Sequence, residues 1–172
     1  YLEDRGIFNV GWISMRHDSN GLACASWWRE RCIEWCYDRV EADRFADQKY
    51  LDRWPKLFQG VAVLNHKGVN TAPYNLGNYS IIQASEELRI DEDPLVIFHF
   101  HGFRKISPML YDPNLAVYKT RMTRIIRRNI YGTYIHALRA VHRELAAHFP
   151  DQTPHAKRVI NSARDKKLKL DA

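Results

Sequence analysis

Polar side chains that could do chemistry lie at three places in this chain. Asn9 interrupts one apolar run, the pair Asp47-Gln48 opens a segment of helical pattern, and His99 lies at the end of another apolar run. A carboxylate at such a position could hold hydroxyl groups or stabilise positive charge, and an imidazole could bind a metal ion. Each residue also has a simpler role, since Asp47 could cap a helix and Asn9 or His99 could be a hydrogen-bonded buried group.

The apolar run at residues 95–100 predicts a buried strand that ends in His99-Phe100-His101-Gly102. In open α/β sheets, ligands bind beyond the carboxyl ends of the strands, which is where these residues would lie. We expect at most one of the two histidines, His99 and His101, to face a given side.

Two further apolar segments predict strands, and the segments between them predict helices. Residues 7–15 suit a strand that is covered on both faces, and residues 61–64 suit a shorter strand. After a start at Asp18, apolar residues recur at helical spacing from 22 to 40. A second short helix should end at Pro55, because proline disfavours helix at the preceding residue. This alternation predicts an α/β fold.

A long basic helix is predicted in the last third of the chain. Asp112 followed by Pro113 is a typical helix start, and helical spacing continues to about Phe149, with Gly132 as a kink or break. Seven basic residues and no acidic one lie from Lys119 to Arg143. Two interpretations stay open: a packed helix with a solvated basic face, or a surface that docks on anionic lipid.

The composition predicts one ordinary domain with a real core. Of 172 residues, 45% are hydrophobic and 12% are aromatic, and the formal net charge is +6. We expect a soluble, cytoplasmic protein, because no apolar stretch approaches the roughly 18 residues of a membrane helix and no leader is evident. The sequence begins with Tyr1 close to an apolar run, so we also expect a longer parent polypeptide. Cys24, Cys32 and Cys36 suit free thiols better than a zinc site.

The order of the motifs resembles the second half of GT-A glycosyltransferases of the glycogenin and lipopolysaccharide galactosyltransferase type. Across residues 7–106 the matching elements are Phe8-Asn9-Val10-Gly11, Asp47-Gln48, the strand with Leu64, Tyr74-Asn75, and His99-Phe100-His101-Gly102 with Lys105. The chain also resembles a bacterial group of nucleotide-sugar transferases that carry WWRE, DQKYLD and HFHG motifs, found here at 27–30, 47–52 and 99–102.

This resemblance implies a partial GT-A, Rossmann-like mixed sheet with flanking helices and a helical C-terminal extension. It implies an enzyme that moves a sugar from a nucleotide-diphosphate donor to a glycan, lipid-linked or other hydroxyl acceptor, with retention of configuration favoured. A divalent cation, Mn²⁺ or Mg²⁺, would stabilise the negative charge on the departing nucleotide.

The resemblance also implies roles for single residues. His99 matches a metal-ligating histidine whose partner ligands are aspartates of a DxD motif. Asn9 matches a residue that faces the donor sugar. Asp47 and Gln48 match the catalytic pair near the transferred sugar and the acceptor. We therefore expect His99 and Asp47 to converge on one pocket.

The implied diphosphate site combines a glycine and a cation. Lys105 matches the diphosphate-binding lysine, and Gly102 would let backbone amides approach phosphate oxygens closely. The chain departs from the family where Ile106-Ser107 replaces a Pro-Trp pair, and Arg104 could take the place of Lys105 as the phosphate cation.

We predict an acceptor-side half of a glycosyltransferase domain at 1–110, a basic helical extension at 111–150 and a polar tail at 151–172. Without a nucleotide-binding half, the fragment should be inactive alone. The alternatives are a non-enzymatic module that binds nucleic acid or an anionic surface, and a degenerate transferase that binds carbohydrate. Recognised nucleic-acid-binding motifs are missing, so we do not expect that partner.

Overall fold

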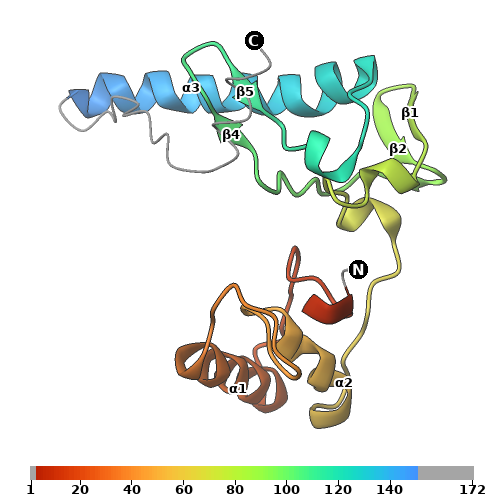
Figure 1. Cartoon of the computed structure of the whole chain (residues 1–172), viewed down its shortest axis with the longest axis vertical. Coiled ribbons are helices and arrows are strands. Elements are labelled where there is room, and N and C mark those ends of the chain that lie inside the picture. Colours follow the sequence, from red (N-terminus) through yellow and green to blue (C-terminus); the bar gives the residue numbers. More distant parts are fainter. Residues whose placement is uncertain (1–2, 151–172) are drawn as a thin grey trace. The chain divides into compact units, whose positions relative to one another are not determined.

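The computed structural model describes residues 3–150, and the chain divides between Asn70 and Thr71 into two compact units. We call them the N-terminal and C-terminal units. They combine helices with small antiparallel sheets, so the protein is a mixed α and β protein (Figure 1). The predicted polar tail, 151–172, lies outside the described residues.

The N-terminal unit is built from helical elements and loops. Its elements are η1 (Glu3–Arg5), α1 (Ser19–Glu34), η2 (Lys49–Arg53), α2 (Trp54–Leu57) and η3 (Lys67–Val69). The predicted start of α1 is confirmed, because the Asp18 carboxylate caps the helix by accepting a hydrogen bond from the Gly21 amide at 2.9 Å. The core of the unit is the cluster Cys24, Leu51 and Trp54, against which half-buried apolar residues pack.

Both predicted helix ends in this unit were wrong. The first helix stops at Glu34, before residue 40, because Trp35 takes an extended conformation and is buried. The second does not end at Pro55, because this proline lies in the first turn of α2, where no intrahelical N–H is needed.

The C-terminal unit contains two small sheets. β1 (Ile81–Ala84), β2 (Glu87–Ile90) and β3 (Asp93–Pro94) form an antiparallel meander in which Ile81 lies opposite Ile90. β4 (Arg104–Lys105) pairs with β5 (Tyr111–Asp112). The helical elements are η4 (Leu76–Asn78), η5 (Ala116–Tyr118), the π-helical η6 (Ile126–Gly132) and α3 (Thr133–His148).

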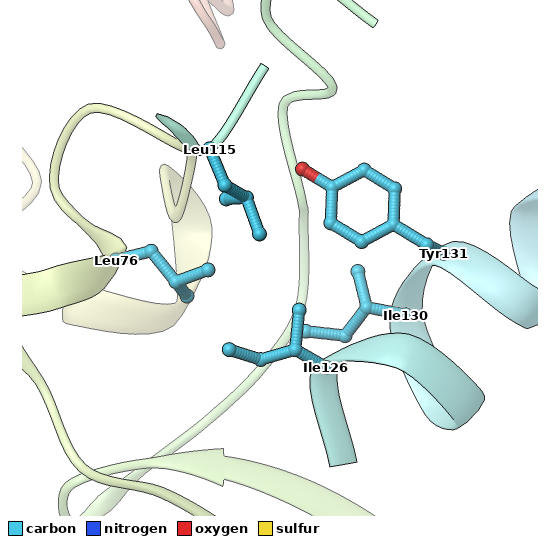
Figure 2. Close-up of a cluster of buried hydrophobic side chains, with 5 residues drawn as sticks. All are labelled: Leu76, Leu115, Ile126, Ile130 and Tyr131. Carbon is cyan, nitrogen blue, oxygen red and sulfur yellow. The ribbon is translucent and has the colours of Figure 1, made fainter. Parts of the chain in front are cut away.

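The core of the C-terminal unit lies between η6 and the loops that precede it. Figure 2 shows its five buried side chains pointing toward one another: Leu76, Leu115, Ile126, Ile130 and Tyr131. The Tyr131 hydroxyl donates a hydrogen bond to the Pro113 carbonyl at 3.0 Å. Burial, followed by the nearby Asp112 charge, raises the pKa of Tyr131 above its ordinary value.

None of the three predicted strands at 7–15, 61–64 and 95–100 forms a strand. A strand needs a hydrogen-bonded neighbour. Within the described residues, the first two segments have no such neighbour, and the third has one isolated bridge, between Thr71 and Phe98. The strands that do form, β1 to β5, lie in segments for which the sequence pattern did not predict a strand.

The predicted helix start at Asp112 was also wrong. Asp112 lies in β5, where its carboxylate accepts hydrogen bonds from the Asn114 amide and the Arg104 guanidinium, both at 2.8 Å. The long helical stretch begins beyond Thr123, whose hydroxyl accepts a hydrogen bond from the Ile126 amide at 3.3 Å. The predicted irregularity at Gly132 coincides with the end of the π-helical stretch. Among the described residues, no helix has both the length and the apolar content needed to span a membrane.

Candidate functional site

The N-terminal unit brings Asn9 and Gln48 into direct contact. These residues are 39 positions apart, and the Asn9 side-chain amide donates a hydrogen bond to Gln48 Oε1 at 3.2 Å. Gln48 Nε2 in turn donates to the Arg5 carbonyl at 3.2 Å, while Asn9 Oδ1 accepts from the Gly11 amide at 2.7 Å. An amide nitrogen carries two N–H donors, so each side chain keeps one for a ligand.

Gly11 and Asn70 complete this polar cluster. A Cβ at Gly11 would lie 2.4 Å from Asn70 Oδ1 and 2.9 Å from Asn9 Oδ1, which is closer than atoms can approach. The glycine of the FNxG-like motif therefore makes room for two asparagine side chains. Sequence reasoning missed Asn70, because it lies in a loop rich in asparagine where spacing gives no signal.

Asp47 is positioned through its backbone. The Trp28 indole, from the WWRE segment of α1, donates a hydrogen bond to the Asp47 carbonyl at 2.9 Å, and the Trp28 ring packs edge-on against Trp54. The half-buried Asp47 side chain lies near enough to Cys32 to contribute to the raised pKa of that thiol, after burial and Cys36. The WWRE and DQ motifs therefore meet in three dimensions.

A cavity of about 840 Å³ opens beside this cluster within the N-terminal unit. Asn9 and Asn70 are part of its lining, and segments 12–15 and 61–64 contribute to the remaining wall together with core residues such as Leu51 and Trp54. A cavity of this size that combines apolar walls with polar side chains is typical of a ligand or peptide site.

The C-terminal unit holds a cluster of four rings: His99, His101, Tyr74 and Tyr118. The Tyr74 ring lies 6.1 Å from His99 and 5.7 Å from His101, and the two imidazoles are 5.7 Å apart, between centroids. Tyr118 lies 6.1 Å from His101 and 6.2 Å from Tyr74. Both histidines therefore contact the same tyrosine.

This arrangement contradicts the expectation that at most one of the two histidines faces a given side. The His101 amide donates to the His99 carbonyl at 2.7 Å, which closes a three-residue turn around Phe100. The expectation was wrong even for a regular strand, because residues two apart lie on the same face. Here a turn replaces the strand and brings both rings to one tyrosine. Tyr118 is the member of the cluster that sequence reasoning missed.

His99 has an unsatisfied buried nitrogen. Its Nδ1 atom is buried and has no hydrogen-bond partner among the described residues. Burial, and to a smaller extent the nearby His101, lowers the pKa of His99 below its ordinary value. The imidazole is therefore neutral near pH 7, which is the form that binds metal ions.

Gly102 is required by its surroundings. It has φ +69°, and a Cβ there would lie 2.1 Å from the Asn114 side-chain nitrogen. Asn114 is buried, and its side-chain amide donates a hydrogen bond to the His101 carbonyl at 3.2 Å. The glycine thus lets an amide from a following loop fasten the end of the HFHG segment, a role that the motif alone does not reveal.

Of the two candidate phosphate cations, Arg104 is engaged within the protein. Its guanidinium lies 2.8 Å from the Asp112 carboxylate, and both side chains are partly buried. Lys105 is exposed. This difference favours Lys105 as the group available to a phosphate.

The described residues contain no group of three or more histidine, cysteine, aspartate or glutamate side chains that could hold a metal ion. His99 fits a single ligand, given its buried Nδ1 atom, and further ligands would have to come from elsewhere. None of the three cysteines forms a disulfide bond in the described structure, and only Cys24 is buried.

Two curated proteins of Bacillus subtilis (strain 168) are similar to this chain. YfnD, described as an uncharacterized protein, is 33% identical over 153 residues, which are 88% of this chain and 49% of YfnD. YfnF, described in the same way, is 36% identical over 103 residues, which are 59% of this chain and 34% of YfnF. No model of a known protein family matches the chain, and no solved structure matches it. The chain spans about half the length of YfnD and a third of that of YfnF.

Proposed function

We propose that this chain is the acceptor-side half of a metal-dependent GT-A glycosyltransferase, which moves a sugar from a nucleotide-diphosphate donor to a hydroxyl acceptor. The observation that best supports this proposal is the hydrogen bond between Asn9 and Gln48. It joins the FNxG-like and DQ motifs, which the resemblance assigns to the donor sugar and the reaction centre.

The polar cluster gives each residue a defined task in this proposal. One remaining N–H on Asn9 would donate to a sugar hydroxyl, and Gln48 would hold Asn9 in place. The Asp47 carboxylate would bind acceptor hydroxyls or stabilise positive charge that develops on the reacting carbon. The bond from Trp28 to the Asp47 carbonyl would keep that carboxylate in place.

The residues of the HFHG segment would act on the diphosphate side. His99 would be one ligand of a divalent cation, because its imidazole is neutral and its Nδ1 atom lacks a partner. When bound, such a cation would neutralise the charge of the departing nucleoside diphosphate. The exposed Lys105 would add a positive charge to the same phosphates.

A chimera in which this chain replaces the matched half of YfnD would test the proposal. It would be incubated with Mn²⁺ and a panel of nucleotide sugars, and release of nucleoside diphosphate would be measured with and without a chelator. We expect release from one or a few donors, abolished by the chelator and absent with the 172-residue chain alone. A soluble chimera that releases nothing from any donor would contradict the proposal.

Docking on anionic lipid is a second candidate function, favoured by the surface of α3. Val141 is 53% exposed and Leu145 is 51% exposed, so the described residues leave about half of these two side chains of the predicted apolar stripe uncovered. Arg139 and Arg143 lie on the same helix. Sedimentation with liposomes should then increase with acidic lipid content and fall for Val141→Ser. Equal sedimentation with neutral and acidic liposomes would exclude this function.

A further inference from the structure

Residues 12–16 have the side-chain pattern of a strand without a strand's partner. Ile13 and Met15 are half-buried against the core of the N-terminal unit, while Trp12, Ser14 and Arg16 are exposed. No hydrogen bond joins the backbone of this segment to any other group among the described residues. Its N–H and C=O groups are therefore available to a neighbouring strand.

Residues 61–64 repeat this situation. Their backbone also makes no hydrogen bond within the described part of the chain, and their sequence is Val-Ala-Val-Leu. Val63 is 49% exposed and Leu64 is 62% exposed. Large apolar side chains beside an unpaired backbone are the features of a surface that accepts an added strand.

Both segments line the same cavity of about 840 Å³. Trp12 contributes an exposed aromatic ring to its wall, and Phe58 closes another part. A strand in this cavity would cover the exposed apolar side chains of both segments. It would also form hydrogen bonds with the unpaired backbone N–H and C=O groups, whose burial without such bonds is costly in free energy.

We propose that this cavity receives a β-strand of the same polypeptide from outside these 172 residues, and that the strand pairs with residues 12–16. The length of YfnD argues for this occupant, because the matched 153 residues are only 49% of that protein. About as much chain again is therefore present in a relative to supply strands. The open segment is five residues long, close to the usual length of about 5–6 residues for a strand. The inference does not depend on sugar transfer.

Hydrogen exchange tests the proposal. Amides of 12–16 and 61–64 would be compared between the 172-residue chain and the YfnD chimera. Once paired, amides of 12–16 should exchange about tenfold or more slowly in the chimera. Equal exchange in both proteins would overturn the proposal. Protected amides in a dimer of the 172-residue chain would also overturn it, because the occupant would then be a second copy.

One exposed valine, Val63, and one exposed isoleucine, Ile33, provide a matched pair of variants. Val63→Glu places a charge in the cavity wall, whereas Ile33→Glu places one on α1, outside the cavity lining, at a side chain that is 69% exposed. In the chimera, Val63→Glu should restore fast exchange at 12–16, and Ile33→Glu should not. If the chimera is insoluble, the two parts would be co-expressed as separate chains. Failure to form a soluble complex in that format as well would count against the proposal.

Discussion

The side-chain amide of Asn9 donates a hydrogen bond to Gln48 across 39 residues of sequence, at 3.2 Å. The two side chains are partly buried, and each has a second hydrogen bond to the backbone, to Gly11 and Arg5 respectively. The contact therefore fixes the N-terminal loop against the turn that precedes η2. A direct hydrogen bond between residues of two separate motifs supports a shared site more strongly than either motif alone.

A double-mutant cycle of Asn9→Ala and Gln48→Ala should reveal this contact as a coupling energy. A partly buried amide pair contributes about 1 kcal/mol, so the double variant should lose about that much less stability than the sum of the single variants. Urea unfolding of the four proteins would give the energies. Strictly additive losses would show that the hydrogen bond is not formed in solution.

Gly102→Ala should destabilise the protein more than Gly60→Ala. Both glycines have φ +69°, so an alanine pays a similar backbone penalty of about 1 kcal/mol at either place. Only at Gly102 would the new methyl group collide with a buried side chain, that of Asn114. We expect a total loss of about 3 kcal/mol there. Similar unfolding midpoints for the two variants would contradict this packing.

The stability of the chain should depend on pH through His99. Its pKa is lowered in the folded state by burial and then by His101, so between the folded and unfolded pKa values the unfolded chain binds more protons. The stabilisation is complete above about pH 6.5, the ordinary histidine value, and is lost as the pH falls below it. His99→Gln should flatten the profile of unfolding midpoint between pH 7.5 and 5. An unchanged profile would show that His99 is not buried in solution.

The cysteines should react with a thiol reagent in a defined order. Cys36 is exposed, whereas burial, followed by the effects of Cys36 and Asp47, raises the pKa of Cys32 to about 11. The thiolate is the reactive form, so at pH 8 Cys32 should react roughly a hundredfold more slowly than an ordinary exposed thiol. Mass spectrometry after short labelling, with Cys36→Ser as the control, would give the order. Labelling of Cys32 before Cys36 would contradict this environment.

The sequence predicted local features of the fold better than it predicted which segments pair as strands. The cap at Asp18 and the first helix follow from residues that are close in sequence, and the structure contains both. The strands expected at 7–15 and 61–64 do not form, because pairing depends on a neighbouring strand that local pattern cannot supply. Asp112-Pro113 has the features of a helix start, but the contact of Asp112 with Arg104 places it in a sheet instead.

In the candidate site, too, single residues could be predicted from the sequence, whereas contacts between distant residues could not. Asn9, Gln48 and His99 could be selected as candidates from residue type and motif order, but the Asn9–Gln48 contact had to be observed. Asn114 and Tyr118 could not be selected, because their roles arise from a turn at Phe100 and a left-handed Gly102. Whether the selected residues bind a metal ion or a nucleotide sugar stays a prediction.

The most direct test of the proposed function is the effect of His99→Ala on metal-dependent release of nucleoside diphosphate by the YfnD chimera. His136→Ala is the matched control, because His136 is exposed on α3. We predict that His99→Ala lowers the rate about a hundredfold or more, as expected when a metal ligand is lost, and that His136→Ala leaves it unchanged. Release at the unaltered rate by the His99→Ala chimera would contradict the assignment of His99 to the metal and, with it, the proposed chemistry.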